Sequence, residues 1–206
     1  MRTVKTAIIY YSSTGSNYQL AQWAGESAEN EGSEVRIRKV HETAPESVIE
    51  KKPLWKKNID ATKHIQEVRP EDLEWADVYV FSVPTRYGNV PAQMKLFLDS
   101  TGPLWQKGAL ANKVVTAMTS AMNPHGGQES TLLTLYTTMY HWGAIVAAPG
   151  YTDSCLFAAG GNPYGTSVAV DMEGRFTPDG ELIKKAVFHQ VKRAVTIGKW
   201  VVQGQE

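Results

Sequence analysis

Residues 4–17 read VKTAIIYYSSTGSN, an apolar stretch that passes directly into a run of hydroxyl residues around one glycine. Residues 4–11 are rich in β-forming side chains and predict a strand that is buried on both faces. After the hydroxyl-rich loop, Leu20, Ala24 and Ala28 recur at helical spacing, which predicts a helix that ends near Gly32. A buried strand followed at once by a helix is the repeating unit of a parallel α/β sheet.

The same alternation continues along the chain. Further strands are predicted at residues 35–40, 78–83, 114–118 and 144–148, and helices after Pro91, after Gly127 and from near Pro178. Residues 41–71 are charged and predict a long excursion with room for a short helix, and residues 150–175 are expected to be irregular. We therefore expect a single α/β domain over residues 1–206: a flavodoxin-like doubly wound five-stranded parallel sheet, order 2-1-3-4-5, with helices on both faces.

Composition excludes some classes of function. Lysine plus arginine and aspartate plus glutamate both number 21, so the net charge is zero and no basic face is expected to bind nucleic acid. The single cysteine, Cys155, excludes an intramolecular disulfide and fits a reducing compartment. We expect a soluble, cytoplasmic protein without stable membrane association.

The loops after the first, third and fourth predicted strands meet at one edge of such a sheet, where ligands of this architecture bind. The first loop, residues 12–17, precedes a helix N-terminus, whose N–H groups and dipole suit a phosphate dianion. It has neither Gly-x-Gly-x-x-Gly nor Gly-Lys-Ser/Thr, so a monophosphate fits better than a dinucleotide or a triphosphate. A plain turn that caps the helix explains this loop equally well when it is taken alone.

The other two loops suit a flat ring. Pro84 and Pro91 stiffen the second loop, and Gly88 permits a left-handed turn, so backbone groups there could bind the polar edge of a heteroaromatic ring. An ordinary turn with a solvated arginine is the simpler interpretation of this loop alone. Residues 119–127 form the third loop, and small side chains there let the backbone approach a ring or a phosphate. Three such loops at one edge together predict a ligand site.

Several motifs occur in one order along the chain. They are Tyr10-Tyr11-Ser12 with Gly15, Pro84-Thr85-Arg86-Tyr87-Gly88-Asn89, Phe97-Leu98-Asp99 with Thr101-Gly102, Leu104-Trp105, Gly126-Gly127-Gln128-Glu129 and Pro163-Tyr164-Gly165. Together they resemble the flavodoxin-like NAD(P)H:quinone oxidoreductases of the WrbA family. The second and fifth motifs are the most specific, and the resemblance covers nearly the whole chain.

The resemblance implies noncovalently bound FMN, with NADH or NADPH as electron donor and a quinone as acceptor. The phosphate would be held by Ser12, Ser13, Thr14, Gly15, Ser16 and Asn17. The isoalloxazine and the nearby ribityl chain would be held by Pro84, Thr85, Arg86, Tyr87, Gly88 and Asn89. The other side of the flavin would be lined by Ser120, Ala121, Met122, Asn123 and Gly126.

The resemblance also implies an assembly and a substrate pocket. Family members are homotetramers in which a histidine from a neighbouring subunit approaches the flavin, and His141 stands at the matching position. Trp105 matches an aromatic residue of the open substrate pocket, and Thr14 falls at a proposed nicotinamide contact. Without the resemblance, a histidine such as His141 is more often an ordinary core or interface residue than a flavin contact.

The expected activity is a two-electron reduction of quinones with ping-pong kinetics, because one pocket would serve both substrates in turn. No side chain is assigned a catalytic role, because solvent can protonate the product. No metal is expected, since His125 has no partner at ligand spacing, and Cys155 is expected to be a packed thiol. A flavodoxin-type electron carrier and a flavin-binding regulatory protein remain as alternatives.

Overall fold

The computed structural model describes residues 2–177 and 179–205. Its strands are β1 (Lys5–Tyr10), β2 (Glu34–Lys39), β3 (Val78–Pro84), β4 (Val114–Ala121), β5 (Ile145–Val146) and β6 (Ser167–Ala169). All the pairings between these strands are parallel, in the order β2-β1-β3-β4-β5, and β6 pairs with β4. The predicted flavodoxin-like order is confirmed.

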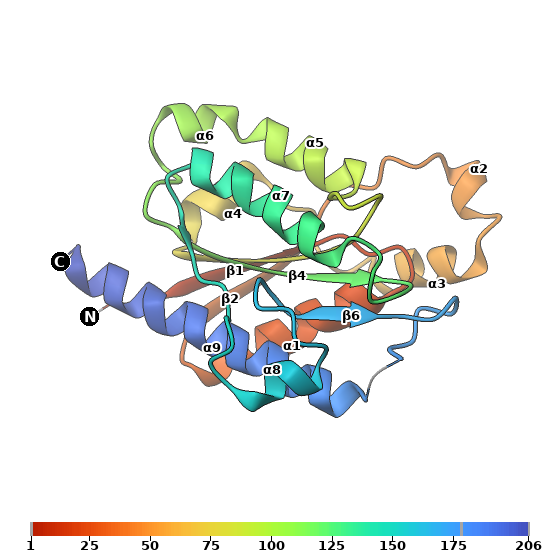
Figure 1. Cartoon of the computed structure of the whole chain (residues 1–206). Helices are drawn as coiled ribbons and strands as arrows, with labels where there is room; N and C mark the ends of the chain where they lie inside the picture. The colour runs from red at the N-terminus through yellow and green to blue at the C-terminus, as the bar shows by residue number, and fades with distance from the viewer. Residues whose placement is uncertain (1, 178, 206) are drawn as a thin grey trace.

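Helices cover both faces of the sheet (Figure 1). One face carries α4 (Pro70–Trp75), α5 (Ala92–Ser100), α6 (Gly102–Gln106) and α7 (Gln128–His141), and the other carries α1 (Ser16–Asn30), α8 (Ser154–Ala158) and α9 (Gly180–Gly204). The short helices α2 (Glu46–Ile49) and α3 (Pro53–Ala61) lie at the end of the sheet toward which β4 and β6 point. That end is where the polar loops gather.

The strands β1, β3 and β4 are almost completely buried because each one packs against helices on both sides. Successive residues of a strand point to opposite faces, so neighbours along the chain enter different cores. Ile9 and Phe81 belong to the core that includes side chains of α5 and α7. Ile8 and Val80 belong to the core that includes side chains of α1 and α9. This double burial explains why β1 and β3 lack the polar alternation of a one-sided sheet.

Residues 150–175 are more ordered than the sequence predicts. They contain α8 and the three-residue strand β6, which among the described residues adds a sixth strand to the five of the predicted order. β4 pairs with β5 only through Val114 and Val115, and with β6 only through Thr119–Ala121. A strand as short as β6 exists because the far end of β4 offers it an unpaired edge, and such pairing leaves no local pattern in the sequence.

Two other segments also refine the prediction. The excursion over residues 41–71 contains α2 and α3 and the start of α4 rather than one short helix. The predicted start of the last helix, Pro178, lies outside the described residues, and α9 begins at Gly180 after Asp179, whose side chain accepts the Glu181 N–H. Within residues 2–177 and 179–205, no helix has the length and apolar character needed to cross a membrane. The assignment of the whole chain to one domain stays a prediction.

Candidate functional site

The first loop leads into α1 through a glycine. Gly15 is the N-cap residue, with φ of 100°, and its N–H donates to Ser12 Oγ at 3.0 Å. No side chain among the described residues caps the first turn of α1. The capping explanation of this loop is therefore wrong. The positive end of the helix dipole faces the loop without a side-chain partner, which suits an anion.

Asn17 fastens this helix start to the two neighbouring strands. Its side chain is 2% exposed, and its Nδ2 donates to Ser120 Oγ at 2.7 Å. The Ser82 hydroxyl donates to the Asn17 carbonyl at 3.0 Å. Loop one is thus held at a fixed position against the carboxyl ends of β3 and β4.

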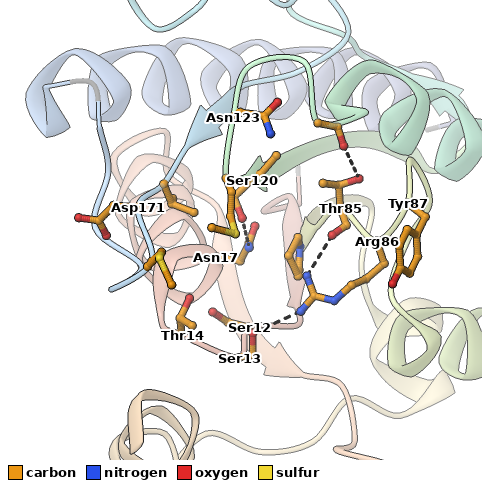
Figure 2. A pocket seen from close by; sticks show the side chains of 16 residues that line it. Ser12, Ser13, Thr14, Asn17, Thr85, Arg86, Tyr87, Ser120, Asn123 and Asp171 are labelled. Atoms are coloured by element: carbon orange, nitrogen blue, oxygen red, sulfur yellow. Dashed lines mark hydrogen bonds between the residues drawn. The ribbon is translucent and has the colours of Figure 1, made fainter. Parts of the chain in front are cut away.

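The second loop makes a tight turn at Tyr87 and Gly88, which have φ of 51° and 76°. Arg86 and Asn89 exchange backbone hydrogen bonds of 2.8 and 3.0 Å around them. Two consecutive residues with positive φ are the pattern of a two-residue hairpin turn, which tyrosine adopts only at a cost. The Tyr87 side chain is fully exposed at the rim of the loop (Figure 2).

The Arg86 guanidinium bridges the first two loops. Its Nη1 donates to the Thr85 carbonyl at 3.0 Å, and its Nη2 lies 3.4 Å from the Ser13 hydroxyl (Figure 2). This arginine is exposed, and its guanidinium lies over the space between the first two loops. A cation beside an uncapped helix N-terminus strengthens the preference of the site for an anionic ligand.

Loops one, two and three enclose a cavity of about 430 Å³, within the usual range of small-molecule sites. The predicted residues that line it are Ser12, Ser13, Thr14, Asn17, Pro84, Thr85, Arg86, Tyr87, Ser120, Ala121, Met122, Asn123 and Gly126. Gly15, Ser16, Gly88 and Asn89 belong to the same loops but shape their turns without lining the cavity. The structure thus brings together residues from three separate loops, and their roles toward a ligand stay predictions.

A fourth segment completes the cavity, and the sequence did not predict it. Val170, Asp171 and Met172 follow β6 and line the wall beside loop one. Their turn is held by Asp171, whose carboxylate accepts N–H groups of Glu173 and Arg175, and Ser16 Oγ donates to the Gly174 carbonyl at 2.7 Å. The Asp-x-x-Gly spacing is a turn signal, but only the pairing of β6 with β4 brings this turn to the site.

Trp105 and His141 lie away from the candidate cavity. The Trp105 indole donates to the His141 carbonyl at 2.9 Å, and neither residue lines the cavity. Trp105 belongs to α6 and His141 is the last residue of α7, and both α6 and this end of α7 are remote from α3 (Figure 1). Their predicted roles depend on a neighbouring subunit and stay predictions. Among residues 2–177 and 179–205, no group of three or more His, Cys, Asp or Glu side chains is arranged to hold a metal ion.

Two tyrosines at the end of β1 stay protonated beside the first loop. Burial raises the pKa of Tyr10 well above its usual value, and the neighbouring Tyr18 raises it further. Burial also raises the pKa of Tyr11, and the Glu42 carboxylate adds to this shift. The Tyr11 hydroxyl donates to Glu42 at 3.0 Å, so it acts as a fixed hydrogen-bond donor.

A parallel sheet in the order 2-1-3-4-5, with a cavity at the carboxyl edge of its strands, defines a flavodoxin-like protein. Residues 4–153 match the family described as NADPH-dependent FMN reductase. The chain belongs to this family.

The chain is also similar to curated proteins called NAD(P)H dehydrogenase (quinone). The protein of that name from Deinococcus radiodurans is 50% identical over 194 residues, which are 94% of this chain and 95% of the relative. The one from Aromatoleum aromaticum is 36% identical over 207 residues, covering 98% of this chain and 99% of the relative. These relatives are matched along almost their whole length.

Solved structures support the fold. A flavodoxin, WrbA-like protein from Agrobacterium tumefaciens has a TM-score of 0.63 at 17% identity, over 96% of this chain and 99% of the other. RosB, crystallised with 8-demethyl-8-formylriboflavin-5'-phosphate, has a TM-score of 0.65 at 13% identity, over 99% of this chain and 82% of the other. At such identities the likeness establishes the flavodoxin-like architecture.

Proposed function

We propose that this protein is an FMN-dependent NAD(P)H:quinone oxidoreductase that reduces quinones by two electrons. The observation that carries the proposal is the four-sided cavity at the uncapped N-terminus of α1. It occurs in a chain that is 50% identical to a protein called NAD(P)H dehydrogenase (quinone).

The residues of the cavity fit FMN. The helix start and the hydroxyls of Ser12, Ser13 and Thr14 supply neutral donors for a phosphate, and Arg86 supplies a positive charge. Asp171 is the carboxylate among the lining residues, and it is paired with Arg175 Nε at 2.7 Å. Its charge therefore does not oppose a phosphate at this site.

When bound, FMN supplies the exchange of two electrons between a nicotinamide and a quinone. The chain supplies the binding surface. Thr85 is fixed by its N–H to the Ser120 carbonyl at 2.8 Å and by its hydroxyl to Thr131 at 2.6 Å, so the second loop offers a rigid edge for a ring. The exposed thioethers of Met122 and Met172 give the rim a soft apolar surface for planar substrates.

Because one cavity would admit donor and acceptor in turn, we propose ping-pong kinetics. Initial rates measured at several fixed quinone concentrations should then give parallel lines in double-reciprocal plots. Intersecting lines would show that both substrates bind together and would refute this part of the proposal.

We further propose a cytoplasmic homotetramer. The outer faces of α5, α6 and α7 expose Leu96, Trp105, Leu133 and Tyr140, each more than 40% exposed, which supports burial against other copies of the chain. Light scattering coupled to gel filtration should give four times the chain mass of 22.8 kDa. A monomer would contradict the assembly and leave the predicted role of His141 without a partner.

The activity is tested by anaerobic stopped-flow mixing of the FMN-loaded protein with NADH or NADPH, and then with benzoquinone. We expect the flavin absorbance to bleach and then to return. If the FMN-loaded protein stays oxidised with both nicotinamides, the carrier alternative is favoured, since a carrier needs a separate reductase. If bleaching occurs without return on addition of quinone, the acceptor is assigned wrongly.

A further inference from the structure

The segment between β2 and α4 contacts the first loop on the side away from the candidate cavity. Asn58 of α3 is 9% exposed, and its Nδ2 donates to the Ser12 carbonyl at 2.7 Å. Ser12 lines both the candidate cavity and a second, smaller one of about 140 Å³, whose wall includes Asn58. The first loop is therefore a thin partition between the two cavities, with Asn58 on the side away from the candidate site.

This hydrogen bond determines the orientation of one peptide group. The bond between Ser12 and Ser13 is trans, so its carbonyl and its N–H point in opposite directions. With the Ser12 carbonyl directed at Asn58, the Ser13 N–H points away from α3. No residue of α3 is among the described residues that line the candidate cavity, whereas Ser13 lines it. The N–H is thus oriented toward the side on which a phosphate would lie.

Two further sets of contacts hold α3 in place. At its far end, Thr62 donates to the Asn58 carbonyl at 2.8 Å and accepts Lys39 Nζ at its own carbonyl at 2.8 Å. Near its start, the Trp55 indole donates to Glu42 at 3.0 Å. Glu42 also accepts the Tyr11 hydroxyl at 3.0 Å, directly before Ser12 in the chain.

Because α3 is anchored near both of its ends, Asn58 holds the Ser12 carbonyl in one orientation before any ligand binds. Preorganised donors bind an anion more tightly than donors that must first be ordered. The Asn58 Oδ1 also lies 3.5 Å from the position that a Cβ on Gly15 would take, so the same side chain packs against the turn into α1.

We propose that Asn58 is a positioning residue for the phosphate of the flavin, acting through the Ser12–Ser13 peptide group without contact to the ligand. The proposal rests on the proposed function, since it assumes that FMN occupies the cavity. It predicts that Asn58 contributes to the binding of FMN and contributes nothing to the binding of riboflavin, which lacks the phosphate.

The test compares flavin affinities of Asn58→Ala and Asn58→Ser with those of the unmodified protein. Flavin-free protein is titrated with FMN and with riboflavin in a phosphate-free buffer, and quenching of flavin fluorescence reports binding. Without Asn58, the Ser13 N–H is no longer held toward the phosphate. Losing that one hydrogen bond to a charged group corresponds to at least about a tenfold loss of FMN affinity. We expect that loss for FMN in both variants, with riboflavin affinity unchanged within about twofold.

Asn30→Ala is the matched control. Asn30 is exposed at the last residue of α1, about 20 Å along the helix from its start, and this variant should bind both flavins like the unmodified protein. Unchanged riboflavin binding also shows that the Asn58 variants are folded.

Several outcomes overturn the proposal. Equal losses for FMN and riboflavin would make Asn58 a general structural residue, and so would failure of both variants to fold. Unchanged FMN affinity would show that the peptide group is oriented without it. If the unmodified protein binds neither flavin, the proposed function itself fails, which is a different result from any failure of the variants.

Discussion

Gln190 is a buried side chain whose replacement should lower the stability of the protein strongly. It lies in the middle of α9 and is 0% exposed. Its Oε1 accepts the N–H and the hydroxyl of Thr166, both at 2.7 Å. Its Nε2 donates to Thr116 Oγ1 and to the Ala117 carbonyl, both at 2.8 Å. One amide therefore connects α9, β4 and the chain segment that enters β6.

Replacing Gln190 with methionine keeps the volume and removes all four hydrogen bonds. At a net value of about 1 kcal/mol each, the loss is about 4 kcal/mol, because the partners stay buried without new ones. For a chain of this length that corresponds to a fall in Tm of about 8–16 °C. Urea unfolding followed by tryptophan fluorescence measures the change in the free energy of unfolding.

The control for this prediction is Gln106→Met at the exposed end of α6, which should change stability by no more than about 0.5 kcal/mol. A loss below about 1 kcal/mol for Gln190→Met would refute the reasoning. It would mean that water or a rearranged Thr166 segment satisfies the freed groups, and that the placement of β6 does not depend on this amide.

Three other predictions concern single groups. Asp77 is 9% exposed; burial raises the pKa of its carboxyl, but the two Arg2 hydrogen bonds and the Lys5 N–H outweigh burial and hold the pKa below 3.8. A carboxyl whose pKa is lower in the folded than in the unfolded state stabilises the protein at pH values above its unfolded-state pKa, so stability should fall as the pH drops below about 4. Asp77→Asn should show a flatter decline of the free energy of unfolding between pH 6 and 2.5. Equal slopes for the variant and the unmodified protein would contradict this. Burial and, after it, the Asp153 carboxylate raise the pKa of Cys155 from 9.0 to about 11. Alkylation of Cys155 by iodoacetamide at pH 8 should therefore be about 100-fold slower than that of a small thiol of ordinary pKa. A rate within a few-fold of that thiol's rate would show an activated cysteine instead. Tyr87→Asn should raise the free energy of unfolding by about 0.5–1 kcal/mol, because asparagine tolerates positive φ, and thermal melting without flavin checks it; a loss of stability would show that the tyrosine ring supports the turn.

Local patterns in the sequence were sufficient for the five strands β1 to β5 and for three of the four loops. The buried strands are runs of apolar β-formers, such as Val78–Pro84, because helices cover both of their faces. The loops between strands carry their own signals, such as Gly88 and Gly127 at positions of positive φ. In a parallel sheet the carboxyl ends of adjacent strands share one edge, so predicting the strand order also predicted which loops meet.

The tertiary structure alone decided the rest, because the interactions involved join residues that are distant in the chain. β6 has three residues and forms only against the free end of β4, so nothing in its own sequence distinguishes it from a loop. Asn58 contacts Ser12 across 46 positions, from a segment whose sequence shows charge and little periodicity. Gln190 interrupts the apolar stripe of α9 and is tolerated there because partners from two other segments satisfy its amide. The sequence by itself determines those helices and strands whose signal is local. Only the assembled sheet determines which buried polar groups form hydrogen bonds with each other.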